Sequence, residues 1–187
     1  GEANETDQSY SLALRGDYLE RLSQALIFSG SQSDRINGES DSKSVLLRTN
    51  ADLYTGWSMN IDLNYSLNTL LSGADQTVKS VYLETDIQPN RRIDVNFDYS
   101  SIWTEETNRS DLWTQYGTIV VLLTITDTLN TLYEYNFRYE EGTTDYSAIS
   151  SEFNVNWSPF PAGDLRFILA YSESIDEADQ ELKTISP

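Results

Sequence analysis

The sequence predicts an all-β protein whose strands run antiparallel to one another. Between Trp57 and Leu67 every second residue is apolar and the residues between them are polar, and a less regular alternation runs from Val45 to Leu53. A side-chain period of two is the period of a strand rather than of a helix. The turn Tyr54-Thr55-Gly56 joins the two stretches and is short enough only for antiparallel neighbours. The two stretches therefore form a hairpin with one apolar face and one polar face.

The same pattern recurs along the chain and predicts about ten strands. They cover residues 9–16, 22–31, 45–53, 57–68, 80–88, 93–100, 112–125, 129–139, 149–157 and 165–172. Polar loops are expected at 31–43, 71–77, 104–111, 140–146 and 174–181. Residues 17–26 also fit a helix capped by Asp17, which remains an alternative. Residues 112–125 are apolar on both faces, so their register is not predicted, and 182–187 look like the start of another strand.

The predicted hairpins repeat with a regular spacing. Aromatic residues near the end of a hairpin recur at positions 28, 65, 99, 139 and 171, which is a period of roughly 36 residues. Short turns alternate with longer polar loops, so the turns collect at one end of the sheet and the loops at the other. This asymmetry is typical of outer-membrane β-barrels.

Charged side chains in the predicted strands from Arg48 onward lie on the face opposite the apolar set. In a barrel, an Arg or Lys near the middle of the lipid-facing wall costs about 2–4 kcal/mol, so charges belong on the inner wall. We therefore predict that the following residues face a lumen: Arg48, Asp52, Asp62, Glu84, Asp86, Asp94, Asp98, Glu134, Arg138, Glu152 and Arg166.

Aromatic residues bracket the aliphatic ones on the apolar face. Trp57 and Trp157 lie at the turn end, and Tyr65, Tyr99, Tyr139 and Tyr171 lie toward the loop end. Two aromatic belts are the membrane-interface pattern of a barrel. The predicted fold is thus an antiparallel up-and-down transmembrane β-barrel, with residues 1–187 as a single barrel domain or barrel section. A soluble β-sandwich with its apolar face inward is the alternative.

Composition narrows the range of functions. The net charge is -18 and the pI is about 4.1, which makes nucleic acid a poor partner. The chain has no cysteine and no histidine, which removes disulfides, thiolate sites and His-based triads. No apolar run is long enough for a transmembrane helix. Gly1 to Asp7 lacks the features of a signal peptide, so any export signal is expected to have been removed or to lie upstream.

The acidic residues suggest two interpretations. Glu84, Asp86, Asp94 and Asp98 fit either a cation-preferring or calcium-binding patch, or a solvated lumen wall with arginines as counter-charges. Loop acids such as Asp34, Glu39 and Asp41 fit either cation bridges to lipopolysaccharide or plain solvated loops. The carboxylates follow the strand period and do not converge on a pocket, so we expect no enzyme, no metal site and no cofactor.

With these features, the chain resembles a bacterial outer-membrane β-barrel of the porin-like type. The segment from Asn154 to Leu165 resembles a recurring strand-turn-strand of large barrels in anaerobic, metal-respiring bacteria. Such families usually end in a strand with a terminal aromatic residue, whereas Ile185-Ser186-Pro187 does not, which suggests an internal section of a larger barrel. The resemblance implies fold and location but no substrate.

The predicted function is an outer-membrane channel or scaffold with a polar, acidic lumen that passes solutes or houses a partner. The expected partners are outer-membrane lipid, lipopolysaccharide and a lumen or periplasmic protein, which by analogy with the resembling barrels would be an electron carrier. A non-conducting structural or adhesive protein of the cell surface is the alternative function.

Overall fold

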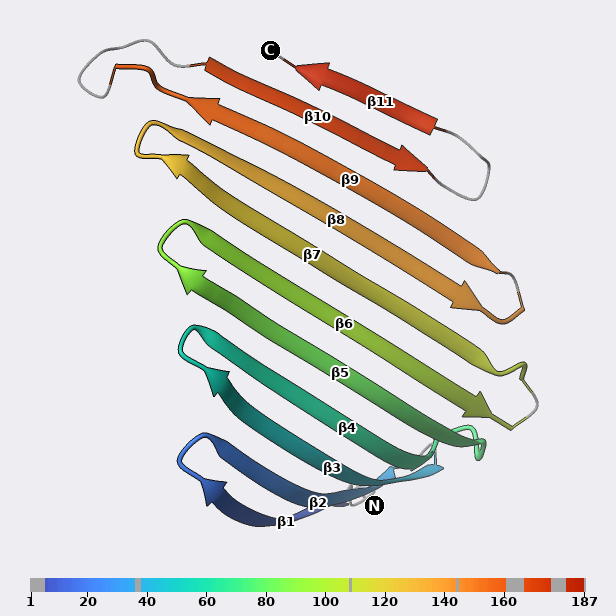
Figure 1. The fold of residues 1–187 in the computed structure, drawn as a ribbon. Coiled ribbons are helices and arrows are strands. Elements are labelled where there is room, and N and C mark those ends of the chain that lie inside the picture. Colours follow the sequence, from blue (N-terminus) through green and yellow to red (C-terminus); the bar gives the residue numbers. More distant parts are fainter. Residues whose placement is uncertain are drawn as a thin grey trace.

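The protein forms one antiparallel sheet whose strands follow the order of the chain (Figure 1). The computed structural model describes residues 6–35, 38–107, 109–143, 145–160, 167–175 and 181–186. The eleven strands are β1 (Thr6–Leu19), β2 (Leu22–Arg35), β3 (Gly38–Tyr54), β4 (Trp57–Thr69), β5 (Asp75–Asn90), β6 (Ile93–Glu106), β7 (Leu112–Thr126), β8 (Leu129–Glu141), β9 (Tyr146–Trp157), β10 (Phe167–Ile175) and β11 (Glu181–Ser186). Among the described residues β1 pairs only with β2 and β11 only with β10, so this part of the sheet is open.

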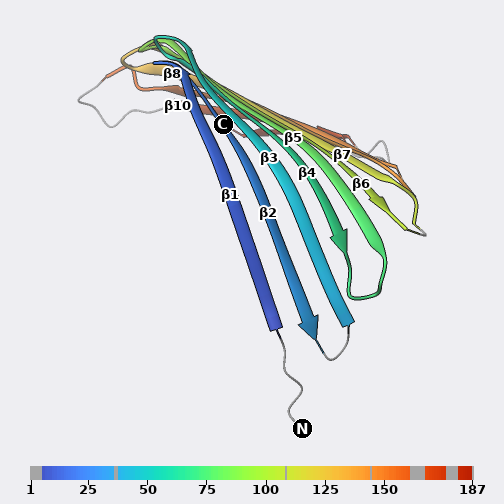
Figure 2. The same cartoon turned by 90° about the horizontal axis from the view of Figure 1, so that it is seen from below.

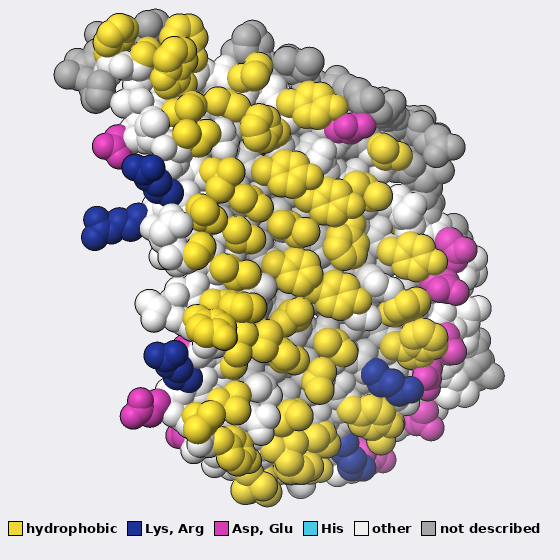
Figure 3. Space-filling view, in the orientation of Figure 1, with side chains coloured by type: hydrophobic (Ala, Val, Ile, Leu, Met, Phe, Trp, Pro, Cys, Tyr) yellow, Lys and Arg dark blue, Asp and Glu magenta, His cyan; other side chains and the backbone are white. Residues whose placement is uncertain are grey.

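The register gives the sheet one apolar and one polar face. Residues directly opposite each other on antiparallel neighbours point to the same side. Thr49, Ile61, Leu83, Tyr99, Gly117, Phe137 and Ile149 form one such row across seven strands. Figure 3 shows this side of the sheet covered with apolar side chains. We call it the apolar face, and the opposite side the polar face.

No described part of the chain forms a layer over the apolar face. The sheet is bowed, with the apolar face on the outside of the curve (Figures 1 and 2). In the described part of the chain Ala51 is the one buried apolar residue, whereas large side chains such as Leu63, Phe153 and Leu169 are exposed by 39–48%. An apolar surface of this extent is not stable in water and requires an apolar environment.

Two glycines on the apolar face lie under aromatic rings. A Cβ atom on Gly30 would be 2.4 Å from the Tyr10 ring, and one on Gly117 would be 2.5 Å from Phe137. Gly117 lies between Tyr99 and Phe137 in the register, and these two rings are 6.4 Å apart across it. The missing side chains therefore let the aromatic rings cover the backbone of the sheet.

The structure corrects several predicted boundaries. The predicted loop at 31–43 is mostly strand, because β2 and β3 stay paired from Ser31↔Ser42 to Arg35↔Gly38. Parts of the predicted loops at 71–77, 104–111 and 140–146 are also strand, and the helical alternative for 17–26 is wrong. Residues 181–186 form an eleventh strand, which agrees with the strand start predicted at 182.

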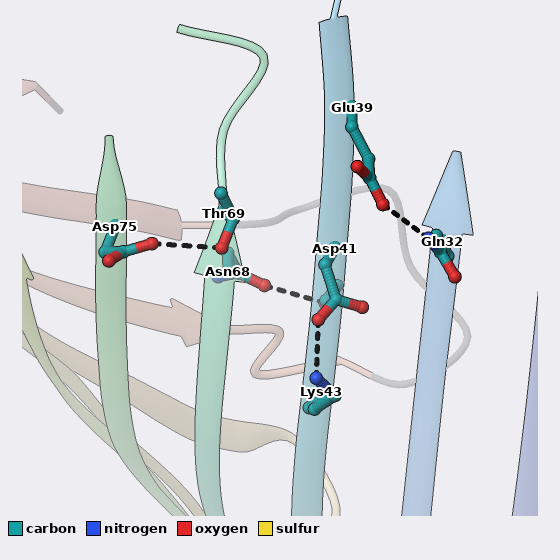
Figure 4. A network of polar contacts seen from close by, with 8 residues as sticks. Gln32, Glu39, Asp41, Lys43, Asn68, Thr69 and Asp75 are labelled. Atoms are coloured by element: carbon teal, nitrogen blue, oxygen red, sulfur yellow. Dashed lines mark hydrogen bonds and ion pairs between the residues drawn. The ribbon is translucent and has the colours of Figure 1, made fainter. Parts of the chain in front are cut away.

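These extensions were missed because their side chains are polar on both faces. Backbone pairing still continues there, since it does not depend on which face is apolar. Polar contacts join the extended strands: Gln32 donates to Glu39, Ser42 to Asn68 and Thr69 to Asp75 (Figure 4). Both faces of these strand ends are suited to water, which places them outside a bilayer. No helix in the described part of the chain is long and apolar enough to cross a membrane.

Candidate lumen-facing wall

The predicted lumen-facing residues that the structure describes all lie on the polar face. Arg48 is opposite Asp62, Glu84 is opposite Asp98, and Glu134 is opposite Glu152. The row through Asp52 continues through Ser58, Asp86, Asn96, Val120, Glu134 and Glu152, and Asp94 precedes Asp98 by four residues on β6. Arg166 lies outside the described residues. The shared face follows from the strand period, and their role as lumen lining stays a prediction.

Six carboxylates of the polar face lie in two neighbouring rows. One row contains Asp52, Asp86, Glu134 and Glu152, and the next contains Glu84 and Asp98. Two pairs of like charges thus face each other across strands, an arrangement that destabilises a sheet by itself. We call these two rows the acidic rows.

Neutral side chains, mostly amides, contact the acidic rows. Asn60 donates to Glu84 at 3.1 Å, Asn136 to Glu134 at 2.8 Å and Asn154 to Glu152 at 2.6 Å. Within the described part of the chain no Lys or Arg forms an ion pair with a member of these rows. Their negative charge is therefore left to water and dissolved cations.

A third row, next to Glu84 and Asp98 on the loop side, has a different character. It runs Arg15, Ala25, Arg48, Asp62, Tyr82, Ser100, Tyr116 and Arg138, so three arginines and two tyrosines from separate strands align. Arg48 binds Asp62 with two nitrogens, Nε at 2.9 Å and Nη2 at 2.6 Å. Arg138 pairs with Glu140, while Tyr82 donates to Asp98 at 3.4 Å. We call it the arginine row.

Part of the arginine row was missed by sequence reasoning. Arg15, Tyr82 and Tyr116 were not among the predicted site residues. Ser100 lies between the two tyrosines in the register and is 4% exposed. The alternation places Arg15 and Tyr82 on the polar face, whereas the face of Tyr116 and the alignment of all these residues follow only from the register between strands.

The predicted interface aromatics all lie on the apolar face, at different heights. Trp57 is the first residue of β4 and stacks on Tyr54 at 6.0 Å, and Trp157 stacks on Phe167 at 5.4 Å. Tyr65 and Tyr139 lie toward the loop end of β4 and β8. Tyr99 lies midway along β6, which extends further than predicted, and Tyr171 is opposite Phe153.

A group of aromatic residues at the loop end was not predicted. Trp103 and Trp113 are directly opposite each other with ring centroids 5.9 Å apart, and Tyr139 meets the edge of Trp113 at 6.3 Å. The indole of Trp113 donates to Ser101 at 2.9 Å. Trp103 lies between the predicted strand at 93–100 and the predicted loop at 104–111, and Trp113 lies in the stretch left without a register, whereas Tyr139 was predicted as an interface aromatic.

The structure offers no built metal site in the part of the chain that it describes. No group of three or more His, Cys, Asp or Glu side chains there is arranged to hold a metal ion. The acidic rows run along the wall instead of converging on one point, which fits loosely held, mobile counter-ions better than a coordinated one.

Comparison with known proteins identifies the fold. No protein-family model matches the sequence, and the comparison with curated proteins found no match either. The structure is similar to the siderophore receptor PirA from Pseudomonas aeruginosa, with a TM-score of 0.67, 10% identity, and coverage of 95% of this chain and 36% of PirA. It is also similar to the ferric citrate transporter FecA, with a TM-score of 0.55, 13% identity, and coverage of 98% of this chain and 38% of FecA.

These similarities confirm the predicted all-β, up-and-down barrel fold and the resemblance to outer-membrane barrels. The chain spans little more than a third of the length of PirA and FecA. The outer-membrane location predicted from the sequence agrees with these matches and with the uncovered apolar face on the outside of the sheet.

The comparisons also correct one prediction. The sequence analysis concluded that the chain is not an enzyme because its carboxylates do not converge. The two structural matches above are outer-membrane barrels at 10% and 13% identity, so they show the fold and leave catalysis open. Because one fold hosts many functions, a barrel fold does not exclude catalysis, and we withdraw that conclusion.

Proposed function

We propose that the chain forms the wall of an outer-membrane channel whose acidic lumen favours cationic over anionic solutes. The observation that carries this proposal is the pair of acidic rows on the polar face. Glu84 is opposite Asp98 and Glu134 is opposite Glu152. Amides contact Glu84, Glu134 and Glu152, and the Tyr82 hydroxyl contacts Asp98. Repulsion between such pairs is tolerable where water and mobile cations screen it, as they do in an aqueous pore.

The distribution of charge between the two faces supports the same proposal. The polar face carries most of the acids, whereas the middle of the apolar face is covered by uncharged side chains (Figure 3). A wall with lipid on one side and water on the other has this arrangement. In a lumen, rings of Asp and Glu raise the local cation concentration and lower that of anions.

Reversal potentials test this proposal. The protein is reconstituted in planar bilayers under a potassium chloride gradient, and we expect a potential of the sign that a cation-preferring pore gives. The double variant Glu84→Gln/Asp98→Asn reduces the preference because it removes one opposed pair of charges. Glu141→Gln, which changes an acid on the apolar face at the loop end, is the matched control and leaves the preference unchanged.

Two results would overturn the proposal. An anion-preferring pore would show that the acidic rows do not line the conducting path. Absence of conductance in every salt would rule out the channel function and favour a structural or adhesive role for the barrel.

A further inference from the structure

Two lysines interrupt the apolar face near its loop end. Among the strand residues whose side chains the structure describes, Lys43 on β3 and Lys79 on β5 are the cationic ones on this face, and both remain about half exposed or more. The sequence analysis assigned both to loops or loop margins and gave them no role. They flank β4, where Tyr65 is directly opposite Lys79 and Leu67 is directly opposite Lys43.

Lys79 lies at the rim of a groove on the outer surface. The groove has a volume of about 580 Å³. Its apolar lining is Leu63, Tyr65, Val81, Trp103 and Trp113, and its polar lining is Asn64, Ser80, Ser101, Lys79 and Glu105. Tyr65 and Trp103 are the direct neighbours of Lys79 on β4 and β6, so Lys79 lies between two aromatic residues in its row. The groove is therefore mainly apolar along its floor and carries the Lys79–Glu105 ion pair at its loop end.

The height of the lysines on the barrel wall matches a membrane surface. Lys43 is eleven residues from Tyr54 and Lys79 is eleven residues from Asn90, the turn-end residues of their strands. A strand tilted by about 40° rises roughly 2.6 Å per residue along the barrel axis, so eleven residues span about 28 Å. The apolar band of such a barrel is about 25 Å tall, which places both ammonium groups just beyond its loop-side border.

The ion pairs of these lysines are easily exchanged. Lys79 Nζ is 2.7 Å from Glu105 and Lys43 Nζ is 2.6 Å from Asp41, and all four side chains are at least 37% exposed. Exposed pairs of this kind contribute about 0–1 kcal/mol, so a phosphate can replace a carboxylate at little cost. Both acids lie further toward the loops than their lysines, so the side of each lysine that faces the apolar band is open to a lipid.

We propose that this groove binds one anionic, phosphate-bearing membrane lipid from the loop-side leaflet. An acyl chain lies along Leu63 and Val81 between Tyr65 and Trp103, and the phosphate accepts hydrogen bonds from Lys79, with Lys43 as a second cation across β4. The apolar floor fits the chain, and Lys79 is complementary to the headgroup once the phosphate replaces Glu105 as its partner. The site lies on the outer surface and is separate from the proposed lumen wall.

Quenching of tryptophan fluorescence by brominated lipids tests this site. The background variant Trp57→Phe/Trp157→Phe leaves Trp103 and Trp113 as the reporters. We expect brominated phosphatidylglycerol to quench them at lower mole fraction than brominated phosphatidylcholine. Lys79→Gln reduces that preference about fivefold, the effect of removing one lysine at a membrane surface. Lys79→Arg retains it, and Arg92→Gln, at a turn on the opposite end, leaves it unchanged.

Three results would overturn the proposal: equal quenching by both lipids, an unchanged preference in Lys79→Gln, or an equal loss in Lys79→Arg and Lys79→Gln. Because this measurement reports lipid contact and not conductance, it stands or fails independently of the channel function.

Discussion

Arg48 and Asp62 form the best-defined ionic contact of the polar face. They are directly opposite each other on β3 and β4, and two guanidinium nitrogens bind the carboxylate. Asp62 is also directly opposite Tyr82 on β5, so Arg48, Asp62 and Tyr82 are neighbours in the arginine row on β3, β4 and β5. The pair is partly exposed, with 49% and 21% of the two side chains accessible, so its contribution is that of a well-oriented surface pair.

A double-mutant cycle measures this contact. Arg48→Gln and Asp62→Asn are combined, and urea unfolding from lipid vesicles gives the free energies. We expect a coupling of about 0.5–1 kcal/mol because the geometry is bidentate. The neighbouring neutral pair Asn50 and Asn60, changed to alanine, serves as a control with coupling close to zero. A coupling for Arg48 and Asp62 no larger than that of the control would contradict the contact.

Residue-level roles were only partly predictable from the sequence. The alternation assigns Asp62, Glu84 and Asp98 to the polar face without knowledge of neighbours, because each lies in a regular stretch. It does not show that Glu84 meets Asp98, or that Arg15, Arg48 and Arg138 share a row, since these facts depend on register. Lys79 was missed because it lies at the margin where the alternation was expected to end.

At the scale of the strand, the sequence predicted strands correctly where one face carries apolar and the other polar side chains. It did not predict them where both faces are alike. Residues 57–68 and 129–139 were recognised because one face is apolar and the other polar. The ends of β2 and β3 are polar on both faces, so they were predicted as loop although their backbones are paired. The register of β7 was not predicted for the opposite reason. Its side chains on the polar face of the sheet include the apolar Val120 and Leu122, so the strand shows no alternation.

The hairpin turns depend on glycine at defined places. Gly56 follows β3 with φ of 79°, and a Cβ atom there would be 2.1 Å from the carbonyl oxygen of Gln88 on β5. Gly73, between β4 and β5, has φ of 77°, yet a Cβ atom would meet nothing within 4 Å. The two glycines thus share a left-handed backbone and differ in their surroundings.

This difference gives a matched pair of variants. Gly73→Ala should cost about 1–2 kcal/mol, the penalty for a side chain in the left-handed region. Gly56→Ala should cost about 1–3 kcal/mol more, because the backbone of β5 must also move. Urea unfolding of both variants measures the difference. Equal costs would show that the turn after β3 is not packed against β5 as the structure describes.

At the scale of the whole molecule, the described part of the chain is a curved wall with two different surfaces and almost no buried side chains. Its large apolar side chains lie on one side, its acids lie mainly on the other, and β1 to β11 connect them in a single meander (Figures 1 and 3). A water-soluble protein buries such side chains in a core, whereas this sheet leaves them at the surface. If lipid contacts the apolar face, the polar face lines the proposed lumen, the groove is open to lipid, and the polar strand extensions lie beyond the bilayer.

Site-directed spin labelling tests that placement most directly. Nitroxide labels replace Ile61, Val95 and Leu169 on the apolar face, with Asn60, Asn96 and Asn136 on the polar face as neighbouring controls, in protein reconstituted in lipid bilayers. The account predicts that dissolved oxygen relaxes the first three labels strongly and that a water-soluble nickel complex reaches only the controls. Access of the nickel complex to Ile61, Val95 and Leu169 would contradict a lipid-facing wall.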